Sequence, residues 1–142
     1  NVLIENMGRI NYGSYVADKK GMAGVKLWEV QLFHWTNIAL PMDNLEKLVY
    51  TSESPEEKSL FYKGTFTIDD AKDTFLKLDS FTKGFVTING FNIGRYWEIG
   101  PQKTLYIPAS LLKKGENEII VFESDGLKGE AVIEFVDVPE LG

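Results

Sequence analysis

The hydrophobic and polar positions of this chain alternate with the two-residue period of β-strands over most of its length. In residues 84–93 the alternation continues on both sides of Asn89-Gly90, a pair that accepts the positive φ angles of a type I′ turn. This stretch predicts a β-hairpin. Similar patterns predict further short strands, in residues 2–5, 25–33, 60–68, 74–79, 105–107, 119–122 and 131–136.

Two features interrupt the strand pattern. The alternation of residues 25–33 slips at Trp28-Glu29, which indicates either a β-bulge or a hairpin bend. Residues 42–50 are the best candidate for a short helix, because capping residues stand near the start and the leucines share one face. Residues 109–112 are long enough for one helical turn. The whole pattern predicts an all-β fold, an antiparallel β-sandwich with one or two short helices.

The length of 142 residues fits one domain over residues 1–142. A (β/α)₈ barrel typically takes about 250 residues, so this chain is too short to contain one. Its first residue is Asn rather than Met, and a strand pattern starts at once. We therefore expect a fragment of a larger protein.

Charge and composition exclude several classes of function. The net charge is −6, whereas binding of nucleic acid requires a basic surface. No apolar stretch approaches the ~20 residues of a membrane-spanning helix, so neither nucleic acid nor a membrane is an expected partner. The absence of cysteine excludes disulfides and thiolate chemistry. The compartment stays open between the cytoplasm and a bacterial cell surface or secretion.

Three runs of the sequence resemble a known family: VTINGFNIGRYW at 86–97, GPQ at 100–102 and LYIP at 105–108. They are similar to the C-terminal β-domain of family 35 glycoside hydrolases, the β-galactosidases. The run ENMGRINYG at 5–13 resembles a second signature of these enzymes, and its polar residues suit a structural network: Arg9, Asn11 and Tyr12. The resemblance implies a galactose-binding-like jelly roll, and we expect a bacterial source. The catalytic carboxylates of the family lie in a barrel outside this chain.

Three functions are compatible with these observations. The first is an accessory, non-catalytic domain of a β-galactosidase that hydrolyses terminal β-galactosyl residues. Its partners would be the other domains of the parent enzyme, and it would pack against and support the catalytic barrel without a cofactor. The second is a carbohydrate-binding module that recognises galactose-containing glycans. The third is a stand-alone enzyme, which the missing barrel disfavours.

Aromatic and polar residues near the main signature are candidates for sugar contact. Sugars stack their C–H faces on Trp and Tyr rings, while polar side chains bind the hydroxyls. Candidates of this kind are Arg95, Tyr96, Trp97, Asn92 and Trp35. Aromatic residues also fill sandwich cores and domain interfaces, so packing within the domain or between domains is the alternative reading.

Candidates for metal binding and for catalysis are weaker. Asp69, Asp70 and Asp73 could bind calcium, yet their spacing does not match an EF-hand and equally suits a solvated turn. Glu98 follows Tyr96 and Trp97, but a glycosidase needs two carboxylates around the sugar. His34 is the single histidine, and we interpret it as a surface or loop residue.

Overall fold

The computed structural model describes residues 2–5, 14, 21–52 and 59–142. The chain divides into two compact units, residues 1–41 and 42–142. This division differs from the single domain that we predicted over the whole chain. Except for Glu5, the signature at residues 5–13 lies outside the described residues, and so do its three network candidates.

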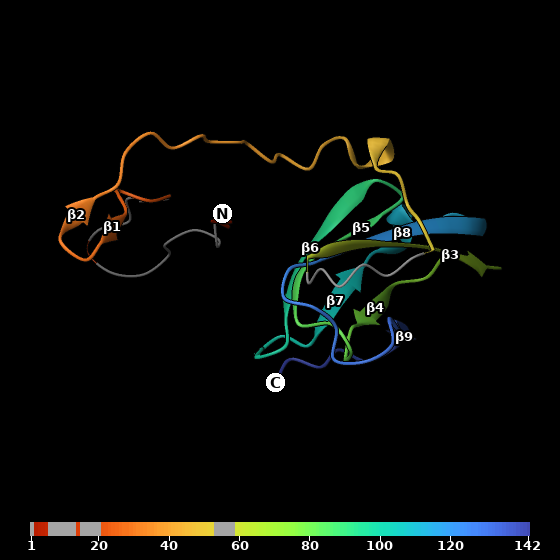
Figure 1. Cartoon of the computed structure of the whole chain (residues 1–142). Coiled ribbons are helices and arrows are strands. Elements are labelled where there is room, and N and C mark those ends of the chain that lie inside the picture. Colours follow the sequence, from red (N-terminus) through yellow and green to blue (C-terminus); the bar gives the residue numbers. More distant parts are fainter. Residues whose placement is uncertain (1, 6–13, 15–20, 53–58) are drawn as a thin grey trace. The chain divides into compact units, whose positions relative to one another are not determined.

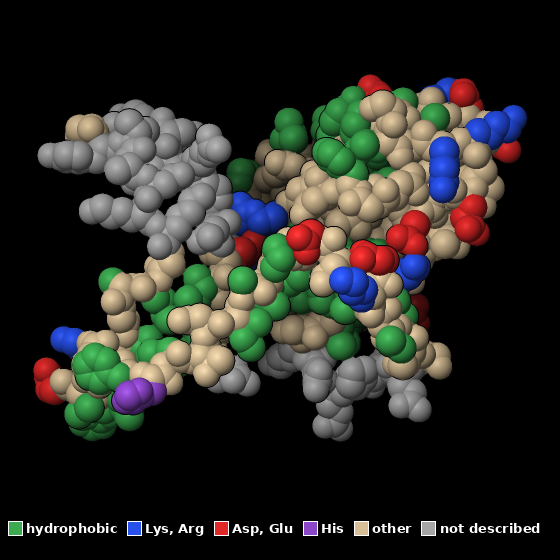
Figure 2. Space-filling model, turned by 90° about the horizontal axis from the view of Figure 1, so that it is seen from above, with side chains coloured by type: hydrophobic (Ala, Val, Ile, Leu, Met, Phe, Trp, Pro, Cys, Tyr) green, Lys and Arg blue, Asp and Glu red, His purple; other side chains and the backbone are tan. Residues whose placement is uncertain are grey.

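The first unit contains a small β-hairpin, formed by β1 (Lys26–Leu27) and β2 (Val30–Gln31). The two strands are antiparallel and joined by a turn at Trp28-Glu29, so the slip in the alternation is a hairpin bend. Residues 2–5 belong to no strand, because a strand needs a neighbour that a local pattern cannot guarantee. None of the described residues of this unit is buried. Figure 2 shows hydrophobic side chains gathered at the surface around the histidine.

The second unit is a sandwich of two antiparallel sheets, which confirms the all-β prediction (Figure 1). The first sheet has four strands, in the order β3 (Leu60–Ile68), β8 (Gly115–Glu123), β5 (Lys83–Ile88) and β6 (Phe91–Trp97). The second has three, in the order β7 (Thr104–Ile107), β4 (Thr74–Lys77) and β9 (Glu134–Val136). All neighbouring strands of both sheets pair antiparallel.

Helical structure in the described residues is limited to two 3₁₀ turns, η1 (Leu45–Lys47) and η2 (Ala109–Leu111). The predicted helix over 42–50 is thus reduced to a single turn. Asn44 forms no side-chain cap, and the backbone is extended again at Leu48. A helix of nine residues is marginal even when it is capped, so this segment lacks the local support to continue.

The core of the second unit lies between the two sheets. Its buried apolar side chains come from β4, β5, β6, β7 and β8 and from the connection between β4 and β5: Leu76, Leu78, Phe81, Val86, Ile88, Tyr96, Leu105, Ile107, Ile119 and Val121. Because side chains alternate along a strand, each of these strands presents one face to this core. The core therefore fixes which residues of the central signature point inward.

The β5–β6 hairpin turns at Asn89-Gly90, as predicted. Both residues have positive φ angles, 50° and 82°, as a type I′ turn requires. The Asn89 side-chain amide also donates to the Leu111 carbonyl and to the Asn117 side-chain oxygen, each at 2.8 Å. One turn residue therefore connects the hairpin to η2 and β8, in addition to reversing the chain.

Candidate functional site

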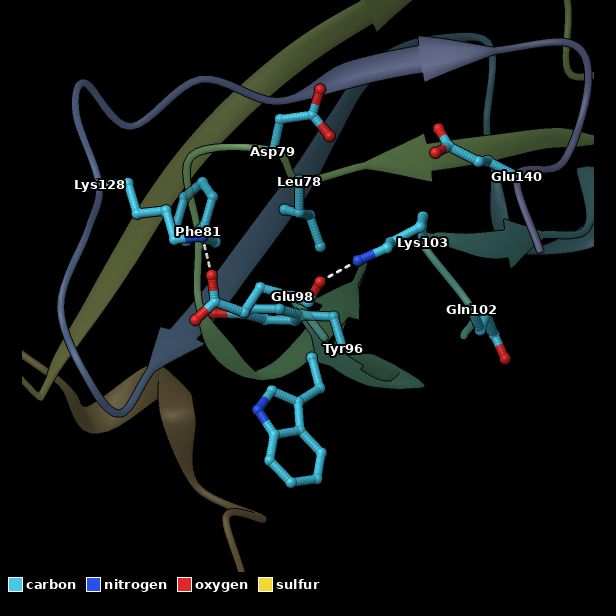
Figure 3. A pocket seen from close by; sticks show the side chains of 10 residues that line it. Leu78, Asp79, Phe81, Tyr96, Glu98, Gln102, Lys103, Lys128 and Glu140 are labelled. Carbon is cyan, nitrogen blue, oxygen red and sulfur yellow. Dashed lines mark hydrogen bonds and ion pairs between the residues drawn. The ribbon is translucent and has the colours of Figure 1, made fainter. Parts of the chain in front are cut away.

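A pocket of about 230 Å³ opens beside the end of β6 (Figure 3). The segments around it are the β4–β5 connection, the end of β6, the β6–β7 connection, the loop after β8 and the segment after β9. The residues that line it are Leu78, Asp79, Phe81, Tyr96, Trp97, Glu98, Gln102, Lys103, Lys128 and Glu140. The pocket is thus a product of segments that lie far apart in the sequence.

Tyr96 and Trp97 are neighbours in the sequence but lie in different environments. Tyr96 is 8% exposed and belongs to the core, whereas Trp97 is 40% exposed. Successive strand residues point to opposite faces, which explains the contrast. The Lys83 ammonium lies 5.1 Å from the centroid of the Trp97 ring, a cation–π contact that holds the indole in place. Of these two neighbours, Trp97 is therefore the aromatic residue that is available to a ligand.

A buried carboxylate anchors Tyr96. Its hydroxyl donates to the Phe122 carbonyl at 2.8 Å and to the Glu123 carboxylate at 3.0 Å. Burial and the neighbouring Glu123 carboxylate raise the pKa of Tyr96 far above its usual range. The hydroxyl is therefore held inward as a neutral donor, so Tyr96 contributes its ring to the pocket wall rather than a group that binds hydroxyls.

Glu123 is fully buried and is the acceptor at the centre of this network. Besides the Tyr96 hydroxyl, its donors are the backbone N–H groups of residues 82, 83, 125 and 126 and the Thr82 hydroxyl. A buried charge is tolerated when hydrogen bonds replace its hydration. The sequence pattern places this glutamate at the end of an apolar strand, and nothing local marks it as buried.

Paired charges surround the mouth of the pocket. Glu98 forms an ion pair with Lys128, and its backbone carbonyl accepts a hydrogen bond from the Lys103 ammonium, so Figure 3 shows Glu98 between two lysines. Asp79 and Glu140 both bind the Lys77 ammonium, at 3.2 and 3.3 Å. The carboxylates of the pocket are engaged with cations of the chain itself. This arrangement suits a neutral, polar ligand better than an ion.

The other three predicted sugar contacts do not line this pocket. Arg95 is exposed on β6. The Asn92 side-chain oxygen accepts from the Gly94 N–H at 2.9 Å, a local contact beside the irregularity between β5 and β6. Trp35 lies in the other unit, where its indole N–H donates to the Leu32 carbonyl at 3.2 Å. The structure thus brings together Tyr96 and Trp97 of the predicted set.

Sequence reasoning missed five polar residues of the pocket: Asp79, Gln102, Lys103, Lys128 and Glu140. Gln102 belongs to the run GPQ of the family signature, and this was the one available signal. The others stand in polar turns or near the end of the chain, where such residues are common. Only the packing of the sandwich shows that they share one pocket.

The acidic cluster does not assemble into a metal site in the structure. The Asp73 carboxylate accepts from the Tyr106 hydroxyl at 2.7 Å and from the Ala109 N–H at 2.8 Å. These hydrogen bonds, the one from Ala109 first, lower the pKa of Asp73. Asp70 lies 3.5 Å from the Lys72 ammonium, and Asp69 is exposed. Within residues 2–5, 14, 21–52 and 59–142, no three metal-ligating side chains gather. Asp73 instead ties β4 to η2 and β7.

His34 is an exposed residue with a positive φ angle of 64°. Its position agrees with our interpretation of a loop histidine. In the part of the chain that the structure describes, no helix is long and apolar enough to cross a membrane.

Residues 59–117 match the sequence model of the β-galactosidase galactose-binding domain, and residues 1–41 match that of the first all-β domain of β-galactosidases. Over both ranges the chain is therefore similar to β-domains of β-galactosidases. The two matches agree with the division at residue 41.

Proteins named β-galactosidase or β-galactosidase-like are similar to this chain along nearly its whole length. β-Galactosidase 17 of Arabidopsis thaliana is 37% identical over 96% of this chain, and β-galactosidase-1-like protein 2 of Homo sapiens is 41% identical over 99%. β-Galactosidase 1 of Dictyostelium discoideum is 38% identical over 97%. The chain spans 22% to 23% of the length of these three relatives. All three are eukaryotic, so these matches give no support to the bacterial source that we expected.

Proposed function

We propose that this chain is the accessory β-domain region of a β-galactosidase that hydrolyses terminal β-galactosyl residues. Its role is to pack against the other domains of that enzyme and to support the catalytic barrel. One observation carries the proposal. The chain is similar, along nearly its full length, to a segment that makes up about a quarter of the length of proteins named β-galactosidase or β-galactosidase-like. The acidic net charge favours protein domains over nucleic acid as partners.

The chemistry of the pocket supports a role other than hydrolysis. A glycosidase needs one carboxyl group that donates a proton and a second carboxylate about 5–10 Å away, across the sugar. The pocket carboxylates of Asp79, Glu98 and Glu140 are held by lysines of the same chain. Carboxylates that are occupied by lysines do not present such a pair to a sugar. The proposal therefore places hydrolysis elsewhere in the parent enzyme.

A comparison of the isolated chain with the full-length parent protein tests this proposal. The full-length protein should hydrolyse a chromogenic β-galactoside, and the purified 142-residue chain should not. Deleting these 142 residues from the parent should lower both its activity and its thermal midpoint. Hydrolysis by the isolated chain, in proportion to its concentration through two purification steps, would contradict the assignment of an accessory role.

Glycan binding at the pocket is the second candidate function. Trp97 offers a partly exposed indole beside a pocket that holds amide, carboxylate and ammonium groups. A pyranose presents an apolar face and a ring of hydroxyls, and such a combination of surfaces suits both. Gln102 donates from its side-chain nitrogen to the Thr104 carbonyl at 2.8 Å, which leaves its side-chain oxygen as an acceptor.

An NMR titration of the isolated chain with galactose, lactose and N-acetyllactosamine tests this second function. Saturable shifts should gather at Trp97, Gln102 and Lys103 and should disappear in Trp97→Ala. The matched control is Trp35→Ala, which removes a tryptophan from the other unit and should leave the shifts unchanged. If no shifts appear at tens of millimolar sugar, glycan binding is ruled out and the supporting role is the one proposed function that remains.

A further inference from the structure

The β1–β2 hairpin of the first unit presents an apolar face to solvent. Leu27 and Val30 are direct cross-strand partners, so their side chains lie on the same face. They are 61% and 64% exposed. Lys26 and Gln31, the other pair, lie on the opposite face. The hairpin is therefore amphipathic, with its apolar side uncovered.

The tip of this hairpin carries Trp28 in an unfavourable backbone conformation. Its φ angle is 58°, in the left-handed region where glycine is preferred and bulky side chains are rare. Its side chain is 91% exposed, more than any other large hydrophobic residue described. A strained residue persists where the surrounding structure or a function requires its side chain. A tryptophan at a hairpin tip has the form of an anchor for a partner pocket.

The described part of the first unit has no core of its own to compensate. Large apolar residues are exposed along it: Val2, Leu3, Ile4, Met22, Leu27, Trp28, Val30, Phe33, Trp35, Ile38 and Leu40. A two-stranded hairpin is at best marginally stable in water. Exposed apolar residues in this number are unusual for a protein surface and mark an interaction site. The unit therefore requires a surface to pack against.

We propose that this hairpin docks, with Trp28 as its anchor, into an apolar β-sheet surface of the same β-galactosidase polypeptide, outside these 142 residues. Two observations identify this occupant. Residues 1–41 match the first all-β domain of β-galactosidases, and the chain spans less than a quarter of each relative named above, so most of each relative's length lies outside the match. Among the described residues, β1 and β2 pair with each other alone, and their outer edges also suit the addition of neighbouring strands. The inference rests on the proposed membership in a longer β-galactosidase.

Hydrogen–deuterium exchange of the peptide that covers residues 25–33 tests the docking. Exchange should be several-fold slower in the full-length parent protein than in the 142-residue chain. Trp28→Gly relieves the φ strain and removes the anchor, so it should leave the isolated chain as stable as before or more stable. In the full-length protein the same variant should restore fast exchange and lower the thermal midpoint. The control is Val138→Ser, which alters an exposed apolar residue of the other unit and should change neither the exchange of residues 25–33 nor the thermal midpoint.

Each alternative occupant has its own signature. One such result in the isolated chain is protection of the hairpin that increases with protein concentration, together with a dimer in sedimentation velocity. That result would show that the hairpin docks on a second copy of this chain instead of on the proposed surface. Protection that is independent of concentration in the isolated chain would assign the face to this chain itself. Equal, fast exchange in both proteins would refute docking altogether. The activity assay tests the proposed function independently of the docking. If the full-length protein hydrolyses β-galactosides but its hairpin exchanges fast, the docking is wrong and the proposed function stands. If its hairpin is protected but it does not hydrolyse β-galactosides, the proposed function is wrong and the docking stands.

Discussion

The Tyr96 hydroxyl donates a hydrogen bond to the Glu123 carboxylate across a distance of 3.0 Å, beneath the pocket of the second unit. Tyr96 comes from β6 and Glu123 from the end of β8, and β5 lies between them in the sheet. The contact is possible because Gly84, on the intervening strand, has no side chain to separate them. A single hydrogen bond thus fixes the pocket wall to the least exposed charge of the described chain.

Replacement of this carboxylate should destabilise the second unit strongly. Glu123→Gln keeps the shape but turns an acceptor into an NH₂ group that faces several N–H donors. Leaving such buried groups unsatisfied should cost about 3 kcal/mol in the free energy of unfolding, measured by urea denaturation. Glu130→Gln, at an exposed position, should stay within about 0.5 kcal/mol of the wild type. A loss of under about 1 kcal/mol at Glu123 would show that the network is dispensable.

The raised pKa of Tyr96 predicts a loss of stability at alkaline pH. Unfolded tyrosine ionises near pH 10, whereas burial and Glu123 keep folded Tyr96 protonated. Its contribution is therefore complete below about pH 10 and is lost as pH rises towards the folded pKa, by up to about 1.4 kcal/mol per pH unit. Urea midpoints between pH 8 and pH 11 measure this slope. Tyr96→Phe should be less stable than wild type at pH 8 and should show a shallower decline, and an unchanged slope would contradict the assignment.

Gly84 should tolerate no side chain. A Cβ atom at this position would lie 1.7 Å from the Phe122 carbonyl oxygen and 2.8 Å from the Tyr96 hydroxyl. Gly84→Ala must therefore separate β5 from β8, and we expect a loss of more than about 3 kcal/mol in thermal or chemical unfolding. The control is Gly129→Ala, where a Cβ would meet no atom within 4 Å and the stability should hardly change. Equal stability of the two variants would contradict the packing described here.

Asp73 should titrate below the ordinary range of aspartate. The Ala109 N–H and the Tyr106 hydroxyl both stabilise its charged form. Its contribution to stability is present above the ordinary aspartate pKa and is lost as pH falls through the lower, folded value. Side-chain carboxyl NMR should show the low pKa, and Tyr106→Phe should raise it only in part, because the Ala109 N–H remains. Tyr50→Phe removes a hydroxyl elsewhere and should leave this pKa unchanged.

The local patterns predicted the strands well and the helix poorly. The alternation around Asn89-Gly90 specified the turn because positive φ angles are a property of two adjacent residues. The segment 42–50 carried an apolar periodicity, but one turn formed, because helix length depends on caps and packing that the periodicity does not contain. The bend at Trp28 was open between two readings until the pairing of Leu27 with Val30 settled it.

The candidate site divides in the same way. Sequence reasoning found Trp97 and Tyr96 together but could not separate their environments, since it does not say which side of a strand faces the core. Sequence patterns did not predict that Lys128 and Glu140 line the pocket, because both residues reach it from loops that are distant along the chain. Glu123 looked like an ordinary charged residue after an apolar strand.

The sequence by itself determined the all-β class, the positions of most strands, the Asn89-Gly90 turn and the resemblance to β-galactosidases. These features depend on residues that are close together in the chain. The tertiary structure alone decided the division into two units, the burial of Tyr96 over Glu123 and the composition of the pocket. These depend on how distant strands and loops pack, and desolvation and hydrogen bonding across that packing set which side chains remain available to a ligand.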